Sequence, residues 1–292
     1  MLRLIVCALL FPALQLRTFH QLSYLALPST IAVVLAVAAV LIVLLYTAPS
    51  GEERRPTVLW VPASTLPLQV VSHISSFLFA YMGHSMYFEI MREMEVSSDF
   101  SKALVVSNLI MGACYTGTAA TAYAASGDAV AGFLPDSMPD GVAKSGVSFL
   151  LAFHTAVSYL VAGQPLHRAL HRRFFPGSVD EQTRRAQLHW LACSSGTLLL
   201  SLLVAVAVPF FSAMQDFLGA LLGAPIVFGL PAFFFVRAAR ASNTPIKPVD
   251  LAICTLFLAF FTPLFAIVGT GMSLVQIADS WAAEGQQALG RL

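Results

Sequence analysis

The sequence predicts an all-α polytopic membrane protein with about eight transmembrane helices, and three observations support this fold class. Hydrophobic residues make up 58% of the chain and charged residues only 11%, whereas a soluble domain carries about a quarter charged residues. The mean hydropathy is +0.78. The charges fall in short clusters between apolar runs, and several of these runs reach the roughly 20 residues that a bilayer-spanning helix needs. The net charge of +1 gives no indication of nucleic-acid binding.

The first apolar run, from Leu4 to Leu16, is short for a transmembrane helix. Its length, directly after Arg3, also fits the core of a signal peptide. No small-residue cleavage pattern follows before Arg17, so we favour a short helix over residues 2–18.

Seven further spans follow along the chain. They are predicted near residues 24–48, 66–92, 103–126, 145–166, 188–213, 216–237 and 251–277. No low-complexity linker or soluble domain separates them. We therefore expect residues 1–292 to form a single transmembrane domain.

Loop charges predict the orientation of these spans, because basic loops remain on the cytoplasmic side. The arginine-rich loop 167–185 and the basic loop 237–247 are expected inside, and the acidic loop 128–140 outside. Asp216 would then lie in an outer turn between two spans. The same alternation places Met1 outside, which suggests that an odd number of helices is missing upstream.

The span near residues 71–95 differs from the others because it places many polar groups at bilayer depth. These are Ser72, His73, Ser75, Ser76, Tyr81, His84, Ser85 and Glu89. Such groups are tolerated where they face a bundle interior or a watery cavity. Gly83 lies near the middle, where the helix could open and present free carbonyls to an ammonium group and free N–H groups to a carboxylate. Alternatively, Gly83 only allows close helix packing and the serines hydrogen-bond between helices; composition alone leaves both interpretations open.

This span also carries a family resemblance. Phe79-Ala80-Tyr81-Met82-Gly83-His84, followed by Glu89-Ile90 and Met94, resembles the signature of the amino acid/auxin permease family, which typically reads Phe-Ala-Tyr-Gly-Gly-His, then Glu-Ile, then Met. Further matches follow in order at Phe100 to Ala103, Tyr115, Ala122-Tyr123, Ser126-Gly127, Arg184-Arg185, Val208 to Phe211, Leu218 to Ala220 and Leu230-Pro231. Upstream, residues 11–46 resemble the fourth and fifth helices of the family, so the resemblance covers most of the chain.

The resemblance implies part of a leucine-transporter-type inverted-repeat bundle, truncated at the N-terminus because the family's first three helices have no counterpart here. It implies secondary active transport of amino acids, coupled to H⁺ or Na⁺, in a plasma membrane or a vacuolar or lysosomal-type membrane. The implied partners are the lipid bilayer and a small amino-acid substrate, with no cofactor and no nucleic acid. The substrate would be held at the broken helix by Phe79, Ala80, Tyr81, Met82, Gly83 and His84. Met82 replaces a family glycine, which should stiffen the hinge or narrow the pocket.

Two groups of residues are candidates for ion coupling. His84 could carry the coupling proton, since imidazole titrates near neutral pH, although a neutral histidine bonded to a neighbouring helix is the simpler interpretation. Glu89 could contribute to gating or form an ion pair near the cytoplasmic surface. The resemblance also points to Ser148, Thr155 and Ser158 as sodium ligands through their hydroxyl oxygens, but the first helix, which would supply partner ligands, has no counterpart.

Two other classes of function remain as alternatives. His167 and His171 lie one helical turn apart, as in membrane di-iron enzymes, and imidazole suits iron; the surrounding arginines also fit a loop that binds lipid headgroups. The chain could also be a non-transporting, truncated paralogue that acts as a membrane binding or scaffold protein.

Overall fold

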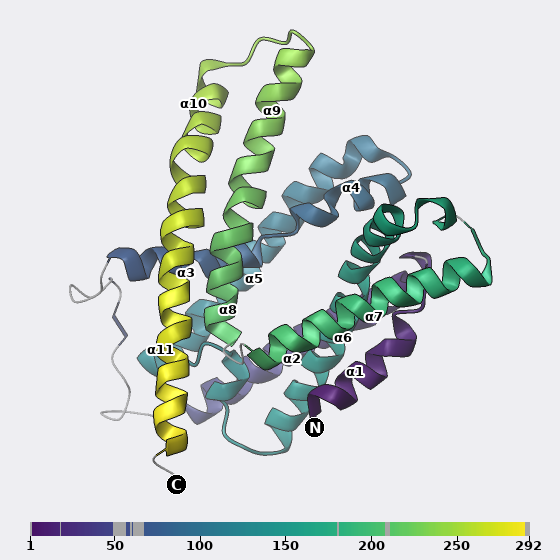
Figure 1. The fold of residues 1–292 in the computed structure, drawn as a ribbon. Helices are drawn as coiled ribbons and strands as arrows, with labels where there is room; N and C mark the ends of the chain where they lie inside the picture. The colour runs from purple at the N-terminus through teal and green to yellow at the C-terminus, as the bar shows by residue number, and fades with distance from the viewer. Residues whose placement is uncertain are drawn as a thin grey trace. The chain divides into compact units, whose positions relative to one another are not determined.

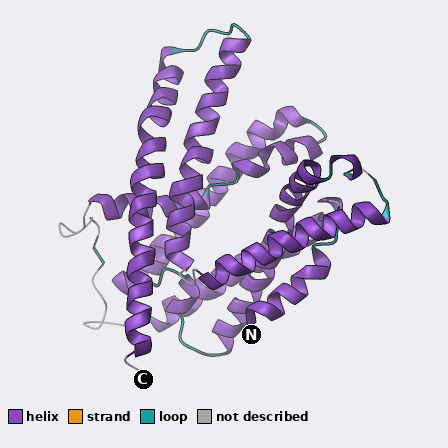
Figure 2. Cartoon of the chain, viewed as in Figure 1, coloured by secondary structure: helices purple, strands orange, loops and turns teal. Residues whose placement is uncertain are grey.

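The computed structural model is all-helical, which confirms the predicted fold class (Figures 1 and 2). The described residues are 2–17, 19–48, 57–58, 60, 67–179, 181–207 and 211–289, and no strand occurs among them. The chain divides into two compact units. Unit 1 comprises Met1–Thr57 and Val96–Ala207, and unit 2 comprises Val58–Glu95 and Val208–Leu292.

Unit 1 consists of long apolar helices joined by short loops. The helices are α1 (Leu2–Ala13), α2 (Phe19–Thr47), α5 (Phe100–Ser126), α6 (Val142–Phe174) and α7 (Arg184–Ala207). The end of α5 is set by Gly127, which has a φ of 58°. Glycine adopts a positive φ without the steric penalty of a Cβ, so it is common at helix ends.

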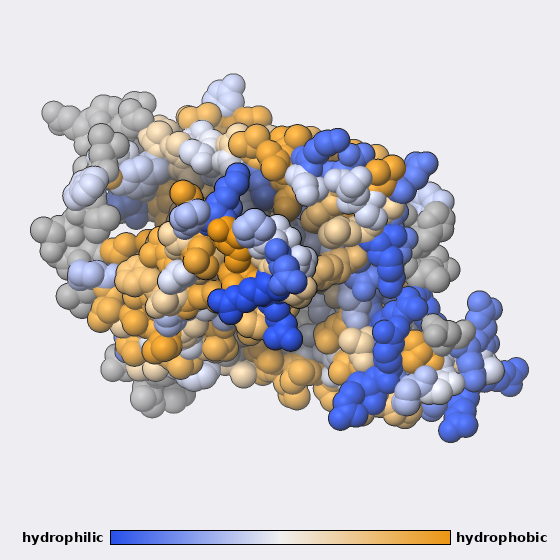
Figure 3. All heavy atoms as spheres, turned by 90° about the horizontal axis from the view of Figure 1, so that it is seen from above, coloured by the Kyte–Doolittle hydropathy of each residue, from blue (hydrophilic) through white to orange (hydrophobic). Residues whose placement is uncertain are grey.

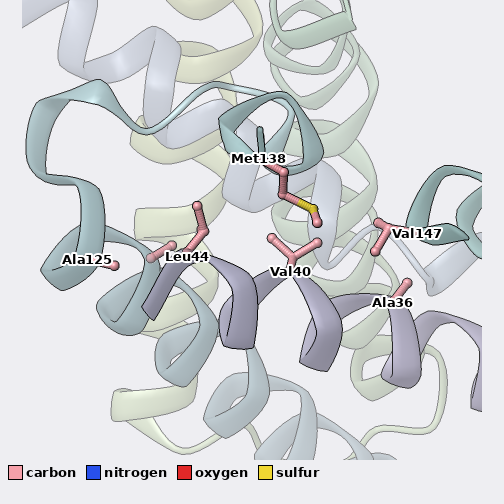
Figure 4. Close-up of a cluster of buried hydrophobic side chains, with 7 residues drawn as sticks. Ala36, Val40, Leu44, Ala125, Met138 and Val147 are labelled. Carbon is pink, nitrogen blue, oxygen red and sulfur yellow. The ribbon is translucent and has the colours of Figure 1, made fainter. Parts of the chain in front are cut away.

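The core of unit 1 forms along one face of α2. Ala36, Val40 and Leu44 recur every four residues, which places them on one side of the helix, and each is at most 3% exposed. They belong to one buried cluster with Met138 and Val147, and Figure 4 shows Met138 extending toward Val40. Because lipid is as apolar as these side chains, close packing rather than exclusion of water holds the helices together here.

A second cluster attaches α1 to α6 and α7. Leu14 is fully buried against Leu160 and Leu198. The indole N–H of Trp190 donates to the carbonyl of Leu14 over 3.0 Å, and the side-chain amide of Gln164 donates to the carbonyl of Leu16. These bonds satisfy carbonyls beyond the end of α1, which no longer have a helical partner.

Unit 2 is built from shorter and less regular helices. Its α-helices are α3 (Pro67–Ala80), α4 (His84–Glu93), α8 (Phe211–Leu218), α9 (Leu230–Ala241), α10 (Pro248–Leu256) and α11 (Thr270–Leu289). Wider π-helical turns connect α8 to α9 and α10 to α11, and they occupy Gly219–Gly223, Pro225–Gly229, Phe257–Phe261 and Leu264–Gly269. Pro225 begins one of these stretches, and Pro263 directly precedes another. Proline has no N–H to donate and clashes with the preceding turn, which disturbs the α-helical pattern.

Among the described residues, six helical segments are long and apolar enough to cross a membrane. They are Tyr24–Thr47, Ser97–Ala129, Val142–Phe174, Arg184–Ala207, Ser212–Ala241 and Pro248–Ala282. The apolar helices Leu4–Ala13 and Pro67–Ala80 are shorter. Each of the eight predicted spans therefore contains helix, but those near 2–18 and 66–92 do not form one helix of full crossing length. Positions 18, 66 and 208–210 of the predicted spans lie outside the described residues.

The surface of the helices is strongly apolar. Large side chains such as Leu109 on α5, Leu200 on α7 and Ile267 before α11 are exposed. Figure 3 shows hydrophobic residues over much of the visible face, with hydrophilic residues gathered in patches. Apolar side chains that face outward from nearly every long helix suit a lipid environment. The protein is thus a multi-pass integral membrane protein.

Candidate functional site

The polar helix of unit 2 is interrupted at its middle. α3 ends at Ala80 and α4 begins at His84. Between them the N–H of Met82 donates to the carbonyl of Phe79 over 3.1 Å, and the N–H of Gly83 donates to the carbonyl of Tyr81 over 2.8 Å. Both turns are tighter than the α-helical pattern, in which each N–H reaches back four residues. The predicted helix break is therefore confirmed.

The break brings two unlike helix ends together. Gly83, at the start of α4, has φ −73° and ψ −7°, and no side-chain hydrogen bond caps this end. The first N–H groups of a helix have no partner within it and carry partial positive charge, and the last carbonyls carry partial negative charge. Around the break Ala80 and Gly83 are exposed, whereas Phe79, Tyr81, Met82 and His84 are half-buried. Binding of a substrate by these six residues stays a prediction.

Gly83 does not mark a close contact between two helices. A Cβ added at Gly83 would meet the ring of Tyr87, one turn further along, at an ordinary distance of 3.4 Å. The close approaches occur at other glycines instead: an added Cβ would lie 1.8 Å from the Ser75 carbonyl oxygen at Gly219 and 3.3 Å from the Leu78 Cβ at Gly223. The packing interpretation of Gly83 is therefore wrong. The glycines that allow α3 to pack closely are Gly219 and Gly223, after α8, and Gly269, before α11, where an added Cβ would lie 3.0 Å from the Ser75 hydroxyl.

Two of the three serines of α3, in contrast, bond to neighbouring helices, whereas Ser75 bonds to the carbonyl of Val71 within α3. The hydroxyl of Ser72 lies 3.1 Å from that of Ser273 and donates to Gln276 over 3.3 Å, both on α11. The hydroxyl of Ser76 donates to the carboxylate of Asp216 on α8. Hydrogen bonds of this kind hold helices together within a bilayer. The segment therefore combines a helix break with a polar interface that positions its first half.

Asp216 is the residue that sequence reasoning misplaced. We expected it in an outer turn, but it lies in α8 and is only 3% exposed. Besides the bond from Ser76, one carboxylate oxygen lies 3.5 Å from Nδ1 of His73, whose side chain is 68% exposed. The expectation failed because the sequence shows an isolated acidic residue between two apolar runs, and only the packing of α3 against α8 reveals its partners.

The two proposed coupling residues have different surroundings. Nδ1 of His84 is buried and has no hydrogen-bond partner among the described residues; the ring lies 4.7 Å from that of Tyr87 at an angle of 40°. Glu89 forms an ion pair of 2.9 Å with Arg92, three residues further along α4, so it has the structural role considered above. The side chain of Ser85 lies outside the described part of the chain. Coupling by His84 and gating by Glu89 stay predictions.

The sodium candidates lie on α6 in unit 1. Ser148, Thr155 and Ser158 are all exposed. The hydroxyl of Ser148 donates to the carbonyl of Lys144 within the same helix, over 2.8 Å. Their spacing places them on one face of α6, and a sodium site at this face stays a prediction.

His167 and His171 do not act together. Nε2 of His167 lies 2.6 Å from the hydroxyl of Thr197, and Nε2 of His171 lies 2.9 Å from the hydroxyl of Ser178. Both rings are buried, and the described residues contain no group of three His, Cys, Asp or Glu side chains placed to hold a metal ion. The two imidazoles serve the packing of α6, and the metalloenzyme interpretation has no support in their geometry.

A cavity of about 450 Å³ lies beside His171 in unit 1, with Arg17, Arg168, Glu181 and Trp190 in its lining. The guanidinium of Arg17 donates to the carbonyls of Val179 and Glu181, each over 3.1 Å. It also lies 5.7 Å from the ring centroid of Trp190, a cation–π distance. Arg17 therefore fastens the loop between α6 and α7 to the residues after α1.

Comparison with known proteins agrees with this architecture. The profile of a family described as "Transmembrane amino acid transporter protein" matches residues 1–275. The chain is 24% identical to the Arabidopsis thaliana protein named amino acid transporter AVT1B, over 92% of this chain and 47% of that protein. It is 28% identical to the Neurospora crassa N amino acid transport system protein, over 70% of this chain and 45% of that protein. It is 23% identical to amino acid transporter AVT3A of Arabidopsis thaliana, over 92% and 59% of the two chains.

The chain thus spans about half the length of these relatives. No solved structure matches it significantly. The matched region includes unit 1, most of unit 2 and the whole of the helix break between α3 and α4.

Proposed function

Because the chain belongs to the transmembrane amino acid transporter family, we propose that it moves amino acids across a membrane by secondary active transport, driven by a proton or sodium gradient. Similar proteins are named amino acid transporters in Arabidopsis thaliana and an amino acid transport system protein in Neurospora crassa. The observation on which the proposal rests is the interruption of a membrane helix between Ala80 and His84.

The two helix ends at this break are complementary to an amino acid. The uncapped start of α4 at Gly83 offers N–H donors and the positive end of a helix dipole, which suit the α-carboxylate. The carbonyls at the end of α3 offer acceptors and the negative end of a dipole, which suit the α-ammonium group. The half-buried rings of Phe79 and Tyr81 would contact the side chain of the substrate.

Coupling and gating are assigned to α4 in this proposal. His84 would exchange the coupling proton beside the substrate, because its ring lies at the start of α4 and interacts with the backbone of Tyr81 within the break. The ion pair between Glu89 and Arg92 would open or close with movement of α4. Alternating access would then follow from rocking of helix groups around the break.

Uptake of amino acids into liposomes that contain the purified chain tests this proposal. The variant Gly83→Leu would fill the break with a bulky side chain, and we expect it to abolish substrate binding and uptake while membrane insertion stays intact. Gly117→Leu is the control, because a Cβ at Gly117 on α5 meets nothing within 4 Å. Unchanged uptake by Gly83→Leu would refute the substrate site, and uptake by the wild-type chain no higher than in empty liposomes would favour the non-transporting scaffold instead.

A further inference from the structure

Asp216 is a carboxylate buried within a membrane-spanning segment. It is 3% exposed and belongs to the candidate span Ser212–Ala241. A buried ionisable group within such a span is unfavourable and is usually retained for function. Resting on the transport function proposed above, we infer that Asp216 is a proton-binding site that couples the proton gradient to movement of the broken helix, in addition to His84.

Both side chains that bond to Asp216 in the described part of the chain come from α3. Ser76 donates to Oδ1, and Nδ1 of His73 lies 3.5 Å from Oδ2. His73 and Ser76 are three residues apart, so they lie on the same face of the helix. α3 ends at Ala80, one turn beyond Ser76. The charge on Asp216 therefore acts directly on the half-helix that forms one side of the break.

Few other ionisable groups surround the carboxylate. The elements packed against α8 are α3, α11 and the π-helical turn Gly219–Gly223. α3 contributes His73 as its only titratable side chain, and the turn Gly219–Gly223 contributes none. The titratable group on α11 within the described side chains is Asp279, which is exposed. The protonation state of Asp216 is therefore set mainly by His73, Ser76 and burial.

The geometry favours a proton over a metal cation. Hard cations such as Ca²⁺ and Mg²⁺ take about six or more oxygen ligands, whereas this site offers one carboxylate and the hydroxyl of Ser76. Oδ2 faces the imidazole of His73, which would repel a cation when it is protonated. A proton needs only one lone pair on the carboxylate.

Proton binding would weaken the attachment of α3 to α8. The ionised carboxylate accepts the Ser76 hydroxyl proton and attracts a protonated His73. Hydrogen bonds to a charged group are about twice as strong as those between neutral groups, so a neutral Asp216 holds both partners less firmly. α3 is then freer to move relative to α8, and the proton leaves when the ionised contacts form again.

The variant Asp216→Asn tests this inference by removing the proton site while keeping a side chain that can accept from Ser76. The 292-residue chain is placed in liposomes and supplied with a radiolabelled mixture of the protein amino acids. We expect the variant to lose accumulation driven by a proton gradient, while counterflow, which exchanges internal for external substrate without a gradient, persists. Asp279→Asn is the matched control, since it makes the same change at an exposed position on α11, and it should retain both activities. Gradient-driven accumulation by Asp216→Asn equal to that of the wild-type chain overturns the inference.

Infrared spectroscopy provides a readout that does not require transport. All 15 Asp and Glu residues give a carbonyl band when they are protonated, so the band of Asp216 is obtained by subtracting the spectra of Asp216→Asn from those of the wild-type chain at each pH. Subtracting the Asp216→Asn spectra should leave a band that appears as the pH falls, and it should also appear when the Asp279→Asn chain replaces the wild-type chain, apart from the contribution of Asp279 itself. A subtraction that leaves no pH-dependent band shows that Asp216 does not bind the proton. If the wild-type chain shows no counterflow but does show the band, the transport proposal fails while the proton site stands.

The variant Ser76→Ala keeps the test decisive if Asp216→Asn does not fold. It removes the hydroxyl that bonds to Oδ1, and the pH at which the carboxyl band appears should change. A pH dependence identical to that of the wild-type chain would contradict the assigned role of the contact with α3.

Discussion

Among the described glycines, Gly219 has the shortest contact for an added Cβ, and it gives a specific prediction about the stability of unit 2. Gly219 begins the π-helical turn after α8, and a Cβ added there would lie 1.8 Å from the carbonyl oxygen of Ser75 on α3. Real Cβ atoms essentially never come closer than 3.0 Å, so α3 would have to retreat by about 1.2 Å in Gly219→Ala. The obstacle is backbone, which cannot rotate away as the end of a flexible side chain can.

The expected loss of stability in Gly219→Ala follows from two opposing effects. Overpacking of a well-packed interior typically costs about 1–3 kcal/mol, and a backbone clash belongs at the upper end of that range. Alanine favours a helix over glycine by about 1 kcal/mol, which offsets part of the loss. We therefore expect Gly219→Ala to lower the free energy of unfolding by about 2 kcal/mol. Because α3 carries the side chains that precede the break, amino-acid uptake should fall as well.

Equilibrium unfolding in mixed detergent micelles measures this change. Gly117→Ala on α5 is the matched control, because the same methyl group meets nothing within 4 Å there. It should be neutral or stabilising by up to about 1 kcal/mol through helix propensity. A Gly219→Ala chain that is as stable as the wild-type chain would show that α3 and the turn after α8 do not approach as closely as described.

Two further stability predictions concern buried hydrogen bonds. Trp190→Phe removes the donor to the carbonyl of Leu14. We expect it to lower the free energy of unfolding by about 1–3 kcal/mol, because a buried carbonyl loses its partner. Equilibrium unfolding measures this change, and an unchanged free energy would mean that this bond does not fix the residues after α1. Ser72→Ala removes the bonds to Ser273 and Gln276 and should lower it by only about 0.6 kcal/mol, the average for hydrogen bonds between membrane helices. A loss for Ser72→Ala as large as that for Trp190→Phe would contradict this ranking.

The sequence by itself determined the membrane class and the approximate positions of the helices, and it indicated Gly83 as a position where a helix could be interrupted. These properties follow from local features: long apolar runs define spans, and a glycine among polar groups marks a place where a helix can open. The conclusion about unusual polarity in residues 71–95 also held, since Ser72 and Ser76 bond to other helices.

The tertiary structure alone decided what those polar groups contact. Asp216 is separated from Ser76 by 140 residues along the chain, and nothing in the local pattern pairs them. The roles of the glycines differ for the same reason: Gly83 lies at a helix end, whereas Gly219 is needed only because the Ser75 carbonyl of another helix passes beside it. Composition and residue spacing predict whether one segment of the chain can form a helix in lipid. A close approach of two helices, or a buried pair of side chains, depends on two segments that are distant in the sequence, so only the tertiary packing determines it.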